Sequence, residues 1–94
     1  MRLTWSALAI ADRMAIFDFI ERDNPAAAIR TDTKIEAGIR QLLQFPESGR
    51  TGRVSGTREL VIAGTPYIAA YSVLSDRIRI LRVLHGAQVW PDSL

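Results

Sequence analysis

The stretch from residue 58 to residue 91 carries three runs of apolar, β-branched and aromatic positions. Gly64-Thr65-Pro66 separates the first run from the second, and Ser75-Asp76 separates the second from the third. Short apolar runs bounded by turn residues are typical of consecutive β-strands. The pattern therefore predicts an antiparallel β-meander over this part of the chain.

Strict alternation along the last run would divide its side chains between two faces of the sheet. One face would carry Ile78, Ile80, Arg82 and Leu84, and the other would carry Arg79, Leu81, Val83 and His85. Both faces are partly apolar, so both require cover. We expect the rest of this chain to cover one face and to leave the other available to a partner.

A helical hairpin is predicted before the meander. After a short strand at residues 2–5, Ser6 is a good N-cap for a helix-compatible run from residue 7 to about 22. Asn24 and Pro25 fit the start of a second helix, which would end near Gln44. We interpret the polar segment 46–56 as a connecting loop, because it lacks the spacing of a phosphate-binding motif. The predicted fold class is α+β, with a short N-terminal strand and a helical hairpin packed on the antiparallel meander.

The first helix is apolar on two of its sides, which suggests a groove beside it. The first side carries Leu8, Ala15, Ile16, Phe19 and Ile20, and the second carries Ile10, Met14 and Phe17. Asp12 falls inside the first side, and a buried carboxylate requires a cation or several hydrogen-bond donors. Arg58 and Arg82 are the two candidate partners for Asp12.

The chain of 94 residues is predicted to form one small domain over residues 1–94. With no cysteine and one histidine, it offers neither a disulfide nor a thiol nucleophile, and we expect no metal site and no cofactor. No apolar run is long enough to span a membrane and no signal segment is visible, so we expect no membrane contact and a cytoplasmic location.

The net charge of +2 is unevenly distributed along the chain. Five basic and six acidic residues lie up to residue 39, whereas seven basic and three acidic residues lie between residues 40 and 82. The predicted sheet is therefore the electropositive half. Eleven of the twelve cations are arginine, which suits contact with carboxylate or phosphate groups, although a solvated basic surface explains the excess equally well.

Several short motifs follow one another along nearly the whole chain. They are Trp5-Ser6, Asp12 with Ile16 and Ile20, Asp23-Asn24-Pro25 with Ala27-Ala28, Phe45-Pro46 with Gly49-Arg50, Gly56-Thr57-Arg58-Glu59-Leu60, Pro66-Tyr67-Ile68 with Tyr71, and Val83-Leu84-His85-Gly86-Ala87. In this order they resemble the RelE/ParE superfamily of type II toxin–antitoxin toxins, and most of all its ParE-like (plasmid stabilisation) branch. Arg13 departs from the pattern, because the family usually carries an apolar residue after the aspartate.

The resemblance implies a toxin that is neutralised by direct binding of a cognate antitoxin, with operator DNA reached only through the antitoxin. The expected antitoxin contacts are Ile10, Met14 and Phe17 of the first helix, and Leu81 and Val83 of the last strand. The resemblance leaves the target open, because members of the superfamily either inhibit DNA gyrase by binding or cleave mRNA on the ribosome.

Ribonuclease chemistry requires a base, an acid and cations for the phosphate. The ribonuclease branch supplies them from lysines and arginines of the sheet and from a Tyr or His near the C-terminus, whereas the predicted sheet here has no lysine. If the chain is an endoribonuclease, His85 with Arg79, and Arg50 or Arg53, is the candidate catalytic set. A structural role for His85, as a strand-end histidine held by a hydrogen bond, is favoured over catalysis, so we name no firm catalytic residue.

Other residues of the motifs have expected structural roles. Arg58, next to Glu59, would neutralise Asp12 or fix the loop. Tyr67 and Tyr71 fit core positions, although tyrosine beside arginine also suits stacking on bases. Trp90 is expected to pack on the sheet or on the antitoxin. The sequence thus favours a growth-arresting toxin that inhibits DNA gyrase, with a RelE-type endoribonuclease acting on ribosomal mRNA as the alternative.

Overall fold

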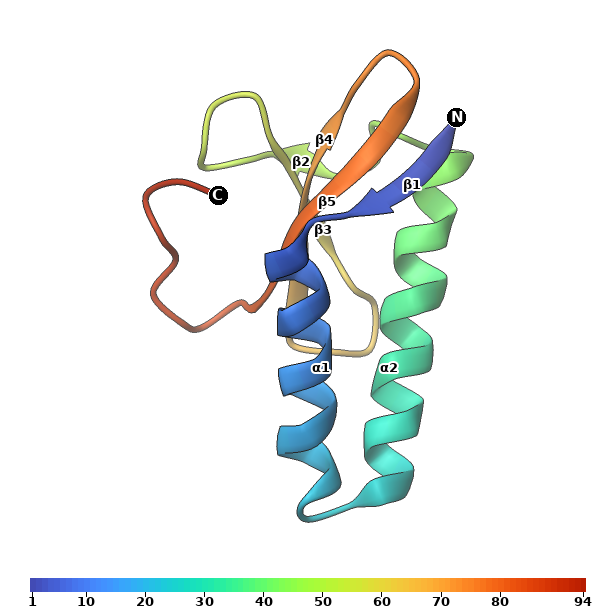
Figure 1. The fold of residues 1–94 in the computed structure, drawn as a ribbon, viewed down its shortest axis with the longest axis vertical. Helices are drawn as coiled ribbons and strands as arrows, with labels where there is room; N and C mark the ends of the chain where they lie inside the picture. Colours follow the sequence, from blue (N-terminus) through green and yellow to red (C-terminus); the bar gives the residue numbers. More distant parts are fainter.

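The computed structural model describes residues 1–94 and contains a helical hairpin and a five-stranded sheet. The elements are β1 (Arg2–Trp5), α1 (Ala7–Glu21), α2 (Pro25–Arg40), the 3₁₀ helix η1 (Gln41–Leu43), β2 (Arg50–Thr51), β3 (Arg58–Val61), β4 (Tyr67–Val73) and β5 (Arg77–His85). Figure 1 shows α1 and α2 side by side and running in opposite directions. This arrangement confirms the predicted α+β class.

The strands are ordered β1-β5-β4-β3-β2. β3, β4 and β5 form the predicted antiparallel meander, and β1 joins its edge by pairing parallel to β5. The segment 46–56 is more than a loop, because Arg50 and Thr51 form β2 against Glu59 and Arg58 of β3. A two-residue strand carries no periodic signal, so the sequence pattern could not reveal it.

The two helices begin where their capping residues predict. The Ser6 hydroxyl accepts a hydrogen bond from the Ala9 amide at 3.0 Å, and the Asn24 side chain accepts one from the Ala27 amide at 3.0 Å. Pro25 occupies the first helical position, where its missing N–H costs no hydrogen bond. The second helix ends at Arg40 rather than near Gln44, because its last turn tightens into η1.

A β-bulge in β5 reverses the expected alternation. Ala70 pairs with Arg82 but Tyr71 pairs with Ile80, so Leu81 is an extra residue on β5. Val83 therefore lies in the main core, and Leu84 lies on the opposite face of the sheet. The prediction that Leu84 shares a face with Ile78 and Ile80, while Val83 faces away, is wrong. Ile80 and Leu81 at the bulge and Val83 and Leu84 after it are all apolar, so these hydrophobic positions do not mark it.

Two clusters of buried residues lie on the two faces of the sheet. The main core joins Ala9 of α1 and buried residues of α2 and η1 to the sheet, and its members are Ala9, Ile35, Ile39, Leu42, Ile62, Tyr67, Ala69, Tyr71, Ile78, Ile80 and Val83. The outer cluster contains Ile68, Ala70, Leu84 and Trp90, with Leu94 packed against it. The centre of the outer face is therefore covered by the protein's own C-terminal tail, which lies away from α2 in Figure 1. Neither helix is both long and apolar enough to cross a membrane.

Candidate functional site

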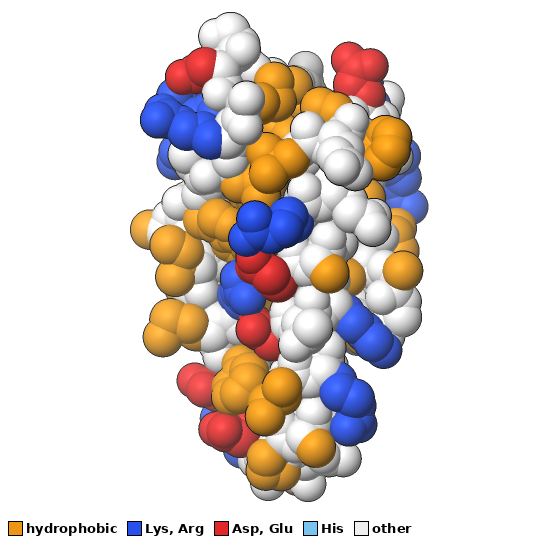
Figure 2. Space-filling view, turned by 90° about the vertical axis from the view of Figure 1, so that its right-hand side faces the viewer, with side chains coloured by type: hydrophobic (Ala, Val, Ile, Leu, Met, Phe, Trp, Pro, Cys, Tyr) orange, Lys and Arg blue, Asp and Glu red, His pale blue; other side chains and the backbone are white.

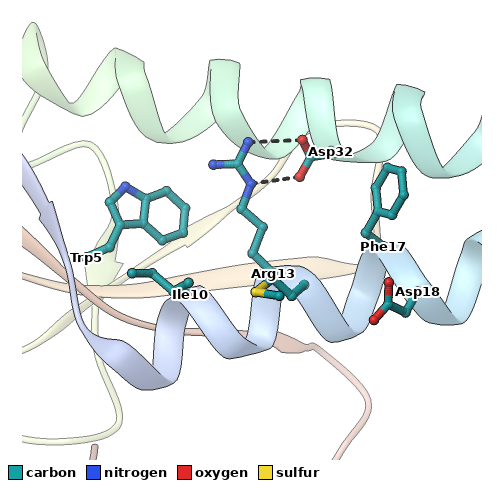
Figure 3. A pocket seen from close by; sticks show the side chains of 7 residues that line it. Trp5, Ile10, Arg13, Phe17, Asp18 and Asp32 are labelled. Carbon is teal, nitrogen blue, oxygen red and sulfur yellow. Dashed lines mark hydrogen bonds and ion pairs between the residues drawn. The ribbon is translucent and has the colours of Figure 1, made fainter.

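A groove of about 540 Å³ lies along α1, and we call it the α1 groove. It is lined by Trp5, Ile10, Arg13, Met14, Phe17, Asp18 and Asp32. In Figure 3, Arg13 reaches from α1 towards Asp32 of α2, with Trp5 near one end of the site and Phe17 near the other. Ile10 is 49% and Met14 62% exposed, so α1 presents apolar surface to solvent along the groove. Exposed apolar surface that is rimmed by polar groups is typical of a protein interaction site.

A chain of ion pairs joins the helices beneath the groove. The Arg13 guanidinium donates hydrogen bonds to both carboxylate oxygens of Asp32 at 2.7 and 3.0 Å, and it donates another to Glu36 at 2.9 Å. Glu36 also accepts a hydrogen bond from Arg40 at 2.9 Å, and this bond, together with Arg13, lowers the pKa of Glu36. On the face shown in Figure 2, acidic and basic side chains alternate in a central column between hydrophobic side chains.

The structure separates the five predicted antitoxin contacts. Ile10, Met14 and Phe17 line the α1 groove together, as their helical spacing predicts. Leu81 is a half-buried residue at the bulge and does not line the groove. Val83 is 1% exposed and packs in the main core, so its prediction as a contact is wrong. The error follows from the missed bulge.

Asp12 joins α1 to the edge of β5 beyond the end of β1. Its carboxylate accepts hydrogen bonds from Arg82 at 2.7 and 3.0 Å and from the backbone amide of Val83 at 2.9 Å. The hydrogen bond to Asp12 raises the pKa of Arg82. Of the two cations predicted for Asp12, Arg82 is the partner. Arg58 instead holds the loop, because it donates to the carbonyl oxygens of Glu47 and Gly49.

Glu59 accepts several hydrogen bonds at the opposite edge of the sheet, beside β2. It is 3% exposed and accepts hydrogen bonds from the Arg50 side chain at 3.0 Å and from the Arg53 amide at 2.8 Å and side chain at 3.0 Å. Burial alone would raise the pKa of Glu59, but the hydrogen bonds from Arg53 and Arg50 outweigh it, so this pKa lies below its ordinary value. Arg53 also stacks on the Trp90 ring at 3.9 Å, which ties the C-terminal tail to the β2–β3 segment.

The two tyrosines are core residues rather than a surface for stacking bases. Tyr71 is fully buried, and its hydroxyl donates to the Pro46 carbonyl at 2.8 Å and accepts from the Gly49 amide at 2.9 Å. Tyr67 is 8% exposed, and burial raises the pKa of both hydroxyls. Neither ring is available to a nucleic acid base.

His85 and Arg79 lie on opposite faces of the sheet. His85 packs edge-on against Tyr67, with ring centroids 5.6 Å apart, and its Nδ1 accepts a hydrogen bond from the Ala87 amide at 3.0 Å. Arg79 lies between the core residues Ile78 and Ile80, so its side chain points to the outer face. About five strand steps separate the two residues, or about 17 Å between Cα atoms. Of the other two candidates for a ribonuclease set, Arg50 and Arg53 are held by Glu59.

Sequence reasoning missed three residues of the α1 groove. Trp5 was noted as part of a motif only, although it contributes one end of the groove and lies 5.2 Å from the Arg13 guanidinium. Asp32 and Asp18 were not singled out. The available signal was Arg13 itself, because a cation in a position that is usually apolar requires an anion on a neighbouring element.

Comparison with known proteins identifies the family. The model for the ParE toxin of the type II toxin–antitoxin system parDE matches residues 3–90. The candidate toxin Y4kP of Sinorhizobium fredii is 41% identical over 93 residues, covering 99% of this chain and 96% of that protein. Toxin RelE2 of Caulobacter vibrioides is 33% identical over 88 residues, covering 94% of this chain and 98% of that protein.

Solved structures agree with this match. A structure described as the chromosomal ParDE TA system from P. aeruginosa superposes with a TM-score of 0.83 at 30% identity, over 90% of this chain and 95% of that chain. The YoeB/ParE toxin from Agrobacterium tumefaciens superposes with a TM-score of 0.63 at 20% identity, over 90% of this chain and 98% of that chain, which supports the fold alone. The chain belongs to the ParE toxin family of type II toxin–antitoxin systems.

Proposed function

We propose that this toxin arrests growth in the cytoplasm by binding and inhibiting DNA gyrase, and that a cognate antitoxin neutralises it by occupying the α1 groove. Membership of the ParE family supports the first part. The exposed apolar surface of α1 supports the second part. The two parts are tested separately.

The separation of His85 from Arg79 is the observation that carries the choice of a binding inhibitor. A ribonuclease needs its proton-transfer group and its phosphate-binding cation around one reacting phosphate. Here the bulge at Leu81 directs these side chains to opposite faces. Glu59 holds Arg50 and Arg53, the remaining candidate cations. The candidate ribonuclease set is therefore not assembled.

The α1 groove indicates the chemistry of the antitoxin segment that would fit it. Its apolar residues Ile10, Met14 and Phe17 suit the apolar stripe of a segment that folds on binding. Arg13 is neutralised within the ion-pair chain, whereas Asp18 at the rim makes no ion pair within 4.0 Å. We expect the bound segment to place a lysine or arginine opposite Asp18.

Gyrase supercoiling in the presence of the purified toxin tests the first part of the proposal. We expect supercoiling to fall as toxin is added and to recover when the antitoxin is added in equimolar amount. An unaffected gyrase, at toxin levels that still arrest cells, would exclude this target. Cleavage of mRNA in the ribosomal A site under those conditions would instead support the endoribonuclease alternative.

A further inference from the structure

The outer face of the sheet, opposite the helices, carries a group of arginines that the proposed function does not use. Arg77 and Arg79 lie on this face because Ile78 and Ile80 point into the core. On β1, Leu3 and Trp5 pack against the core, so Arg2 lies on the outer face as well. Arg77 and Arg79 are about 7 Å apart along β5, with Arg2 on the adjacent strand. We call Arg2, Arg77 and Arg79 the outer arginines.

The outer arginines are poorly neutralised. Asp76 is the only carboxylate that forms an ion pair with them within 4.0 Å, at 3.8 Å from Arg2 and 3.5 Å from Arg77. Arg79 is exposed and makes no ion pair within 4.0 Å. Arg2 and Arg77 are also direct neighbours in the parallel register of β1 and β5. Like charges in directly opposed positions destabilise a sheet, so this arrangement is unfavourable for folding alone.

The charge balance of the whole molecule places its positive excess on this face. Together with Arg50 and Arg53 beside Glu59, the outer face holds five arginines against the carboxylates of Asp76, of Glu59 and of Asp92 in the tail that covers this face. These groups sum to +2, which equals the net charge of the whole protein, so the positive excess of the molecule lies on this face. A face that carries the positive excess of a protein is the electrostatic footprint of a polyanion-binding surface.

We propose that the outer arginines bind the phosphate backbone of double-stranded DNA without reading its sequence. The outer face lacks the means to recognise single-stranded RNA, which relies on bases stacked on exposed aromatic rings. Tyr67 and Tyr71 are buried in the main core, and Trp90 is 8% exposed and lies beneath Arg53. Phosphate contact is therefore the interaction that this face offers.

Contact with the DNA backbone is a property separate from gyrase inhibition and does not depend on it. Backbone contacts position a protein on DNA but carry no sequence information. Recognition of the operator sequence therefore stays with the antitoxin, whereas a direct contact of the toxin with the DNA backbone departs from the expectation that operator DNA is reached only through the antitoxin. The same contact would be available on any duplex, including one that gyrase holds.

Fluorescence anisotropy with a labelled duplex of about 20 base pairs tests the proposal on the toxin alone. Three arginine–phosphate contacts give a slope of about −2.7 for log K against log salt, so affinity falls about 20-fold between roughly 50 and 150 mM salt. The variant Arg2→Glu with Arg79→Glu should weaken binding at least tenfold and bring the slope to about −0.9. Its Tm should not fall, because Glu at position 2 would face Arg77 across the strands.

The matched control is Arg22→Glu with Arg30→Glu, which changes the net charge equally but lies on the helical hairpin. Both arginines are exposed and make no ion pair within 4.0 Å. We expect this variant to bind the duplex within about threefold of the unaltered toxin. An equal loss in both variants would assign binding to net charge and overturn the proposal. So would the absence of duplex binding, or tighter binding to a single-stranded RNA of the same length.

Discussion

At the scale of single residues, the carboxylate of Asp12 connects α1 to the edge of β5. β5 continues beyond the end of β1, so the backbone groups on that edge of β5 have no strand partner, although β4 pairs with the other edge. The Ser6 hydroxyl donates to the Leu81 carbonyl at 2.8 Å, and Asp12 accepts from the Val83 amide at 2.9 Å. Side chains at the start of α1 thus supply hydrogen-bond partners to the backbone groups of β5 beyond the end of β1, and these hydrogen bonds fix the helix on the sheet.

Replacing Asp12 with Ala should destabilise the fold by about 3 kcal/mol, because Arg82 and the Val83 amide both lose their partner. The side chains of Arg82 and Asp12 are only 20% and 14% exposed, so water compensates poorly. Urea unfolding measures the change. Arg40→Ala is the control, since its exposed pair with Glu36 contributes about 0.5 kcal/mol or less. Similar losses in the two variants would contradict a special role for Asp12.

Glu59 should make the fold sensitive to acid. Its pKa in the folded protein lies below the ordinary value of 4.5, because hydrogen bonds from Arg53 and Arg50 outweigh the effect of burial. The stabilisation it provides is therefore complete above about pH 5 and is lost as pH falls through the lowered pKa. We expect Glu59→Gln to flatten the decrease in unfolding free energy below pH 4.5, measured by urea unfolding at several pH values. An unchanged pH dependence in this variant would contradict the role of Glu59.

At the scale of elements, the helices follow from the sequence and the irregularities of the sheet do not. Ser6, Asn24 and Pro25 have local preferences that predict both helix starts, and the structure confirms them. The bulge at Leu81 has no such signal, because both faces of β5 are buried in part by apolar residues. A shift of one residue then moves Val83 to the core without changing any hydrophobic pattern.

The exposed side of α1 provides a test of the α1 groove as the antitoxin site. Met14→Glu should weaken antitoxin binding at least tenfold, about 1.4 kcal/mol, because it introduces a charge into an apolar groove that already holds Asp18. Phe19→Glu is the matched control on the same helix, since Phe19 is 66% exposed and does not line the groove. Calorimetric titration of each variant with the antitoxin measures the effect. Equal losses in both variants would place the antitoxin elsewhere or over all of α1.

At the scale of the whole molecule, the two faces of the sheet are covered by different means. The helices cover one face, and the tail residue Trp90 closes the centre of the other by packing with Ile68, Ala70 and Leu84. The sequence indicated that both faces needed cover and that Trp90 would pack on the sheet or on the antitoxin, and the structure confirms packing on the sheet. The pattern could not show which face the tail would cover. Trp90 lies in a segment without periodicity, and its position depends on Arg53, a residue distant in the chain. Long-range contacts of this kind leave no local pattern.

The opposite orientation of His85 and Arg79 leads to the last prediction, which concerns toxicity. His85→Ala should retain full growth arrest, because His85 packs on Tyr67 and holds the Ala87 amide rather than sharing a site with Arg79. The expected loss of stability is small, about 1 kcal/mol for one neutral hydrogen bond. Viable counts after induction of each toxin, at matched protein levels, measure the effect. Loss of growth arrest in a folded His85→Ala variant, restored by no other substitution at this position, would favour proton-transfer chemistry. Retained growth arrest together with inhibited supercoiling would leave binding as the basis of toxicity.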